Sequence, residues 1–203
     1  GCCLGAGDRS RNMEKISSEA ISQISLEPLL RRYGSGRRRD RMVPVYQAML
    51  AEVEDYSAPQ ALYDEFPLDT LPELSPWLPE DTVAVVLALC TLGPRVQMRI
   101  EELAQSDMLA AVVIDELTLA WVTAITRQMH GSIRNEAHGR GLKAGPAFRP
   151  GLGRWPLETQ HTVFSRLPAQ EIGVALTDDL VMKPRQSTSL IVPLYDRNQV
   201  LTR

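Results

Sequence analysis

The sequence predicts one α/β domain built around a buried strand, a long amphipathic helix and two C-terminal strands. Residues 82–90 (TVAVVLALC) are a continuous aliphatic run without alternation, which is typical of a strand covered on both faces. From about residue 107 to 138, apolar residues recur at helical spacing in a stripe wide enough to cover a sheet. Residues 171–177 and 187–195 are short runs suited to strands. A length of 203 residues with 44% hydrophobic composition suits one such domain, with or without a small subdomain.

Residues 1–12 are small and polar, and we expect a disordered N-terminal extension. With an initiator methionine restored, Cys2 and Cys3 would resemble a doubly acylated anchor, but Gly5 stands where that pattern requires Ser or Thr. Met13 is an alternative start. An extension or a wrongly assigned leader is therefore the favoured interpretation.

Residues 13–80 are expected to form a helical and proline-rich N-terminal arm. Helical spacing in residues 14–33 and in Val43–Asp55 predicts two helices. Between them, four arginines follow a Gly-Ser-Gly tract; a solvated loop is favoured over a phosphate or lipid-headgroup site. Residues 57–80 contain five prolines and are expected to be an irregular connection.

Residues 81–203 are expected to form the α/β core. Pro94 stands at a good first helical position, and residues 94–105 place apolar side chains on one helical face. Ser106 or Asp107 can cap the following long helix. A short helix around Leu157–Leu167 precedes the last two strands.

Composition argues against nucleic acid, membrane and disulfide chemistry. The net charge of −3 gives no global basic field for nucleic acid. The longest uncharged apolar stretch is far shorter than the roughly 20 residues of a membrane span. Three cysteines are a poor disulfide framework, and Cys90 is expected to be a buried thiol. We therefore expect a soluble, cytoplasmic protein.

No complete catalytic or metal-binding constellation is recognisable. His130 and His138 are eight residues apart without a ligand residue between them at metal spacing, so a zinc site is not expected. Asp178 and Asp179 precede an apolar strand, where solvated acids are favoured over a metal site. A less favoured alternative is an enzyme that uses Asp178, Asp179 or Glu171 as acid or base, with a raised carboxyl pKa in a closed cleft.

The loop 146–160 (PAFRPGLGRWPLETQ) is the strongest candidate for a binding site. Gly151 and Gly153 let backbone approach a ligand closely, and Arg149 offers fork-shaped donors to a carboxylate or phosphate, as does Arg154. Trp155 offers a flat apolar face to an adenine, a corrin side arm or a partner protein. The competing interpretation is a proline-stiffened loop whose tryptophan fills a hydrophobic gap, and the residues alone leave both open.

FRPGLGRWPLETQ (148–160), followed by EIGVALTDDLVMKPRQSTSLIV (171–192), resembles the activation (reactivation) domain of cobalamin-dependent methionine synthase. The likeness is greatest to small free-standing proteins related to that domain and covers roughly residues 82–192. The second block is the most specific part, with Met182, Pro184, Ser187 and Ser189 matching in order and spacing.

The resemblance implies a twisted, mainly antiparallel sheet with flanking helices. It implies an accessory protein that docks on a corrinoid-binding methyltransferase, with cobalamin carried by that partner, a flavodoxin-type reductant and S-adenosylmethionine as methyl donor. No independent catalytic residue is implied, because the domain supplies positioning. The implied cofactor-binding residues are Arg149, Pro150, Gly151, Leu152, Gly153, Trp155, Met182, Pro184, Ser187 and Ser189.

Three positions depart from the family's pattern. Ala147 and Leu152 stand where the family typically has the arginine and tyrosine of its adenosylmethionine loop, and Arg127 replaces an acidic residue. Loss of a carboxylate clamp is expected to weaken the site by roughly 30- to 1000-fold. The alternative function is therefore a non-catalytic binding module of the same fold, with a pocket remodelled for a different anionic small molecule.

Overall fold

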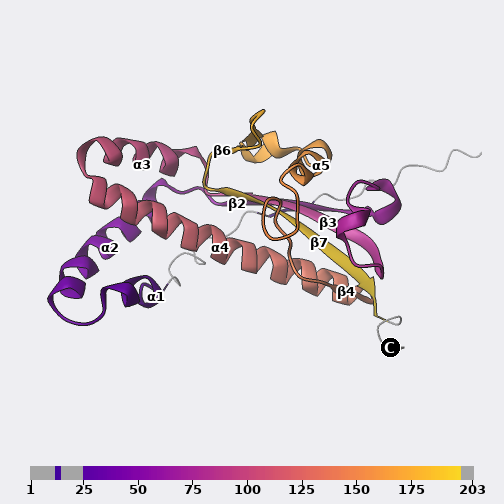
Figure 1. Ribbon diagram of the computed structural model, residues 1–203, viewed down its shortest axis with the longest axis horizontal. Helices are drawn as coiled ribbons and strands as arrows, with labels where there is room; N and C mark the ends of the chain where they lie inside the picture. Colours follow the sequence, from indigo (N-terminus) through magenta and orange to yellow (C-terminus); the bar gives the residue numbers. More distant parts are fainter. Residues whose placement is uncertain (1–11, 15–24, 198–203) are drawn as a thin grey trace, which may run out of the picture.

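The computed structural model describes residues 12–14 and 25–197, and its centre is a five-stranded antiparallel sheet in the order β1–β2–β3–β7–β4 (Figure 1). Helices lie on both sides of this sheet. The predicted class, a mainly antiparallel sheet with flanking helices, is confirmed. The strands are β1 (Asn12–Glu14), β2 (Gln60–Pro67), β3 (Thr82–Thr91), β4 (Leu142–Ala144) and β7 (Ser187–Asp196), with a separate two-stranded ribbon of β5 (Ala175–Leu176) and β6 (Met182–Lys183).

The helices fall into two groups according to the face of the sheet that they cover. One face is covered by the long helix α4, against which α2 and α3 pack, and the other by α5 and short 3₁₀ turns. Their bounds are α1 (Glu27–Leu30), α2 (Arg37–Tyr56), α3 (Pro94–Ser106), α4 (Met108–Gly139) and α5 (Thr159–Arg166), with 3₁₀ helices at Arg31–Tyr33, Leu68–Thr70, Ser75–Trp77 and Ala169–Ile172.

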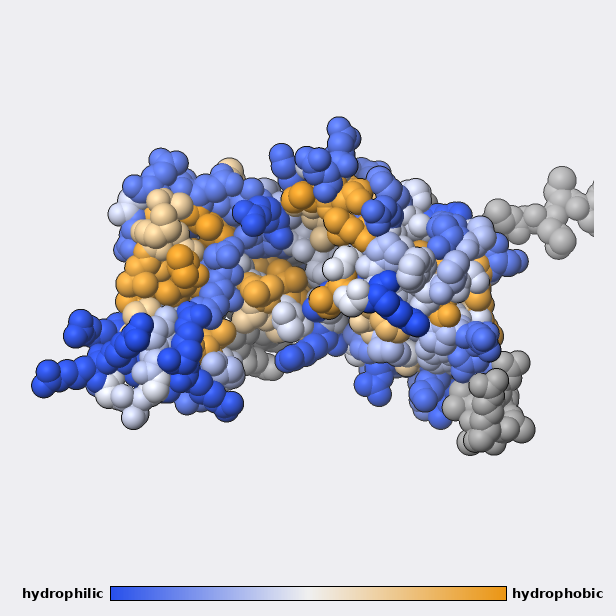
Figure 2. Space-filling view, viewed as in Figure 1, coloured by the Kyte–Doolittle hydropathy of each residue, from blue (hydrophilic) through white to orange (hydrophobic). Residues whose placement is uncertain are grey.

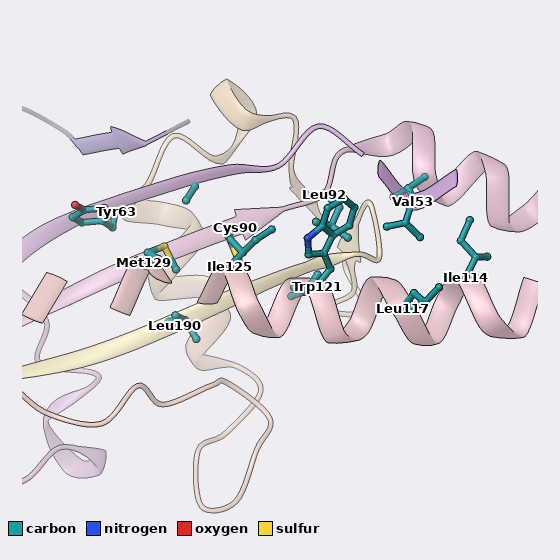
Figure 3. Close-up of a cluster of buried hydrophobic side chains, with 14 of the residues drawn as sticks. Val53, Tyr63, Cys90, Leu92, Ile114, Leu117, Trp121, Ile125, Met129 and Leu190 are labelled. Carbon is teal, nitrogen blue, oxygen red and sulfur yellow. The ribbon is translucent and has the colours of Figure 1, made fainter. Parts of the chain in front are cut away.

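Strand β3 is buried on both faces because it lies in the middle of this sandwich of layers. Its alternate residues Val86, Ala88 and Cys90 face the α4 side, whereas Leu87 and Leu89 face the α5 side. Figure 3 shows Cys90 and the side chains of α4 together in the first of these two cores. The uninterrupted aliphatic run at 82–90 therefore predicts the position of β3 correctly.

Helix α4 begins where the sequence predicts. The Asp107 side chain accepts a hydrogen bond from the Ala110 backbone N–H at 3.0 Å, which caps the helix. Among the described residues, α4 is one helix that is long and apolar enough to cross a membrane by length and composition alone. Half of its apolar window is buried inside the protein, and the core helix of a soluble protein passes the same test. The helix runs across one face of the sheet and carries Trp121, the largest fully buried side chain of the described residues.

Residues 60–67 form strand β2 and correct the expectation of an irregular connection over residues 57–80. Pro59 lies just before β2 and Pro67 is its last residue, so neither removes an N–H from the strand interior. Between them, eight residues pair in register with β3, from Gln60 opposite Thr91 to Pro67 opposite Ala84. This part of the expected N-terminal arm belongs to the sheet.

Four further expectations need correction or lie outside the description. The arginine run is not a loop, since Arg37 begins helix α2. Residues 171–177 are not one strand, because a 3₁₀ turn ends at Gly173 in the left-handed conformation and leaves only Ala175–Leu176. The expected disorder covers residues 1–12, of which 1–11 lie outside the described residues, whereas Asn12 belongs to β1 and pairs with Tyr63. Most of the predicted first helix (residues 15–24) also lies outside the described residues.

Candidate functional site

The loop that follows β4 runs along the free edge of β7. The Gly145 N–H donates to the Pro193 carbonyl at 2.8 Å, and Phe148 and Ile191 exchange two backbone hydrogen bonds of 2.9 Å each. The loop is therefore held as an extension of the sheet. It crosses in front of α4 in Figure 1 before it turns towards α5.

Positive φ angles explain the glycines of the loop. Gly151 has a φ of 79° and Gly153 a φ of 64°, a region that side chains with a Cβ adopt at a cost. A Cβ on Gly151 would lie 2.9 Å from Leu157 Cδ1. The turn closes through the Gly151 N–H, which donates to the Trp155 carbonyl at 3.0 Å. The glycines are thus required by the turn itself, and the exposed Leu152 stands at its tip.

Trp155 is an interior side chain and offers no flat face to a ligand. It is 4% exposed and stacks on Phe148 with ring centroids 4.9 Å apart. Arg154 is also engaged, because its guanidinium donates to the Trp77 carbonyl at 2.9 Å. The interpretation of a stiffened loop whose tryptophan fills a gap therefore describes these two residues.

Arg149 lies on the α4 face of the loop. Phe148 packs in the core on the α5 side and Ala147 packs against the core on the α4 side, so alternation directs Arg149 to the same face as Ala147. Burial raises the pKa of the Cys90 thiol to about 11, opposed by the Thr126 hydroxyl at 3.8 Å and by the positive charge of Arg149. Cys90 faces α4, so its electrostatic interaction with Arg149 supports this placement.

The Arg149 guanidinium has no hydrogen-bond or ion-pair partner among the described residues, unlike that of Arg154. The side chain is half-buried rather than fully solvated. A fork of five donors held at the edge of a sheet can bind a planar carboxylate or a phosphate. Arg149 is therefore the residue of the loop best suited to hold an anion.

The matching residues of the second block are mostly structural. The Ser187 hydroxyl lies 2.7 Å from the Pro184 carbonyl and 2.9 Å from the Thr91 hydroxyl, and Ser189 is 2% exposed within β7. Met182 packs against the core on the α5 side. The Ser187 hydroxyl is therefore used inside the fold, and Ser189 is buried in β7.

The acidic residues considered for catalysis or metal binding are exposed. Asp178 and Asp179 lie in the turn between β5 and β6, and Glu171 lies in a 3₁₀ helix. None of the three lines a cavity described for this chain. In the described ranges 12–14 and 25–197, no group of three His, Cys, Asp or Glu side chains could hold a metal ion.

Three of the cavities described for this chain are lined in part by α4: one includes Ile133 and Glu136, and the other two lie at Asp115–Val122 and at His130–His138. The cavity at Asp115–Val122 has a volume of about 150 Å³ and lies between α4 and residues 185–187. The cavity at His130–His138, of about 590 Å³, lies between α4, β4 and the start of the loop. Figure 2, drawn in the orientation of Figure 1, shows a hollow in the middle of the visible face with apolar surface around it. Arg149 lines neither of these cavities, so a ligand bound at its guanidinium would lie on the α4 side of the loop, outside both of them.

Sequence reasoning missed two residues that shape the cavity at His130–His138. His130 Nε2 lies 2.8 Å from the Gly145 carbonyl, which can only accept, so the ring donates and ties α4 to the loop. A Cβ on Gly145 would lie 2.7 Å from ring atoms of Tyr195, so the glycine admits that ring. Nothing in the local sequence could reveal either contact, because each joins separate elements.

No family model and no curated protein matches the sequence. Among solved structures, the chain is similar to "Crystal Structure of the MetH Reactivation Domain bound to AdoHcy", with a TM-score of 0.68 and 15% sequence identity. The likeness covers 93% of this chain and 78% of that chain. Identity at this level shows a shared fold, which agrees with the fold implied by the sequence resemblance.

Proposed function

We propose that the protein is an accessory protein that docks on the corrinoid-binding subunit of a cobalamin-dependent methyltransferase and supports its reductive reactivation or methyl transfer. The observation that carries the proposal is the fold similarity to the MetH reactivation domain over 93% of this chain. The matching block at 171–192, which resembles that domain in sequence, supports it independently. The protein would act in the cytoplasm, with a flavodoxin-type reductant supplying the electron.

Arg149 is the proposed anchor for the carboxylate of an S-adenosyl ligand. The similar structure is bound to AdoHcy, which carries an α-amino-acid carboxylate. Ala147 stands where the family has its arginine, and Arg149 lies two residues further along, on the same side of the segment that Phe148 bridges to Ile191. One strand repeat spans about 6.5–7 Å, which is within the reach of a guanidinium on its three-carbon stem. Leu152 and the Pro150–Gly153 turn form the rim beside it.

The positive charge of Arg127 on α4 favours the neutral thioether of S-adenosylhomocysteine over the sulfonium of S-adenosylmethionine at this anchor. Arg127 lies one helical turn before His130, the α4 residue that contacts the loop. Arg127 is exposed and cationic, so it repels a sulfonium and leaves the carboxylate contact of Arg149 unaffected. The residues present therefore fit the carboxylate end of the ligand and disfavour its methylated sulfur.

The protein's own part in the proposed function is positioning. S-adenosylmethionine, when bound, supplies the methyl group, and the corrinoid comes with the partner protein. The chain contributes an anion anchor on the α4 side of the loop and a surface that positions the ligand against the partner. No side chain near the anchor is proposed as a general acid, base or nucleophile.

Isothermal titration calorimetry with S-adenosylhomocysteine tests the anchor. We expect saturable binding by the wild-type protein and a roughly 10- to 100-fold weaker affinity for Arg149→Gln, because a charged hydrogen bond contributes about 1.5–3 kcal/mol. Arg154→Gln is the matched control on the same loop, since that guanidinium is bound to the Trp77 carbonyl. Equal losses in both variants, or no binding by the wild type at millimolar ligand, would remove the S-adenosyl ligand from the proposal.

A further inference from the structure

The cavity at His130–His138 is lined by basic side chains. It has a volume of about 590 Å³ and lies between the C-terminal half of α4, strand β4 and Gly145. Five of its lining residues are basic, and no carboxylate lines it among the described residues. The basic residues are His130, Arg134, His138, Lys143 and Arg197.

This concentration of positive charge is opposite in sign to the protein as a whole, whose net charge is −3. Three of the side chains follow helical spacing on α4, at positions 130, 134 and 138, so they share one face of the helix. Lys143 of β4 and Arg197 at the end of β7 face them across the cavity. Several basic side chains from separate elements therefore converge on one space.

Among the described residues, the arginine and lysine side chains of the cavity have no ion-pair partner. Elsewhere the chain pairs Arg32, Arg39, Arg99 and Arg140 with glutamates. In the part of the chain that the structure describes, Arg134, Lys143 and Arg197 make no side-chain ion pair or hydrogen bond. Mutual repulsion of such a cluster costs free energy, and a bound anion removes that cost.

Most of the cavity wall is formed by α4 and β4, with Gly145 and Pro146 from the loop and Arg197 just after β7. Strand β4 pairs with β7, with Ala144 opposite Leu194, and His130 is bound to the Gly145 carbonyl at 2.8 Å. A cavity held in this way is preformed, so little conformational entropy is lost when a ligand binds. Its volume is within the range of about 300–1,000 Å³ that is usual for small-molecule sites.

We propose that this cavity binds the phosphate group of a small organic phosphate. Arginine and lysine donors converging from three directions suit the tetrahedral, multiply charged phosphate better than a single planar carboxylate. A concave site bounded by one helix and a sheet edge encloses a small molecule better than a nucleic-acid backbone. Arg149 does not line the cavity, so the site is separate from the proposed S-adenosyl anchor and does not depend on it.

Calorimetric titration of the full chain with inorganic pyrophosphate, adenosine 5′-triphosphate and adenosine tests the proposal. We expect both phosphates to bind with sub-millimolar affinity and adenosine not to bind, with affinity falling as salt increases. Arg134→Gln and Lys143→Gln are expected to weaken pyrophosphate binding by about tenfold or more each. Arg41→Gln, an equal loss of charge on the exposed surface of α2, is the control and should leave the affinity unchanged.

Two results would overturn the phosphate site. One is pyrophosphate affinity that is equal in the wild type, Arg134→Gln and Lys143→Gln. The other is a single-stranded RNA oligonucleotide that binds ten or more times more tightly than ATP, which would make the surface a nucleic-acid site. Binding of pyrophosphate without binding of S-adenosylhomocysteine would support this inference and count against the proposed function, so the two failures are distinguishable. Thermal unfolding of each variant checks that the exposed substitutions leave the fold intact.

Discussion

Replacement of Trp155 by alanine tests whether this residue belongs to the core or to a ligand surface. A tryptophan side chain carries roughly 150–250 Å² of surface, which at about 25 cal/mol per Å² corresponds to about 4–6 kcal/mol when buried. Trp155 is 4% exposed and stacked on Phe148, so nearly all of this contribution applies. Measured losses for Trp or Phe to alanine in cores are about 3–5 kcal/mol. We expect Trp155→Ala to lower the free energy of unfolding by that amount.

Urea unfolding and scanning calorimetry measure the effect. For a domain of this size the expected loss corresponds to a melting temperature lower by roughly 6–20 °C. Trp155→Phe is the matched control, because it keeps the apolar ring against Phe148 and removes an indole Nε1 that is buried without a hydrogen-bond partner in the described structure. It should retain stability within about 1.5 kcal/mol of the wild type. Stability unchanged in Trp155→Ala, together with lost affinity for S-adenosylhomocysteine, would refute the core assignment.

Four further substitutions test particular positions in the structure. Because burial raises the pKa of Cys90 from 9.0 to about 11, the unfolded chain ionises first, and stability present below pH 9 should fall by about 2–3 kcal/mol as the pH rises to 11. Cys90→Ala should lose that part of the decline in urea unfolding at each pH, and identical pH profiles would contradict the burial. Gly131→Ala should raise stability by about 0.5–1 kcal/mol in calorimetric scans, since nothing lies within 4 Å of its new Cβ in α4. Gly145→Ala should lower stability by about 1–3 kcal/mol, because its Cβ would meet Tyr195 at 2.7 Å; equal effects of the two substitutions would be inconsistent with these contacts. Arg127→Glu should raise the affinity for S-adenosylmethionine relative to S-adenosylhomocysteine by roughly threefold to tenfold in titration. An unchanged affinity ratio would show that Arg127 does not act on the ligand's sulfur.

The sequence predicts the helices and strands that are buried on one face or on both faces. It fails for elements that form only because they pair with a distant strand. The aliphatic run of β3, the capped helix α4 and the strand β7 are found at the expected residues. Strand β2 is missed because prolines dominate its surroundings, although its own alternation puts Tyr63 and Leu62 into opposite cores. Its identity depends on pairing with β3, which is a contact between distant parts of the chain.

The loop illustrates the same limit for function. Its prolines, glycines and arginines mark residues 146–160 as unusual, and within the described ranges Arg149 makes no side-chain hydrogen bond or ion pair. Sequence alone could not separate Arg149 from Arg154, because the difference is a hydrogen bond to the Trp77 carbonyl. The burial of Trp155 likewise depends on stacking against Phe148, which the fold brings about. Spacing on α4 at 130, 134 and 138 carried a signal for the cationic cavity, but Lys143 and Arg197 complete it only after folding.

The most direct test of the proposed function is the spectrum of a purified corrinoid-binding methyltransferase subunit in the cob(II)alamin state, recorded as this protein is added. Docking over the corrin is predicted to change the electron paramagnetic resonance and visible spectra saturably, with S-adenosylhomocysteine tightening the complex for the wild type and having a smaller effect for Arg149→Gln. Spectra that stay unchanged at a large excess of the protein, with every available corrinoid subunit and with or without the ligand, would contradict the proposed function.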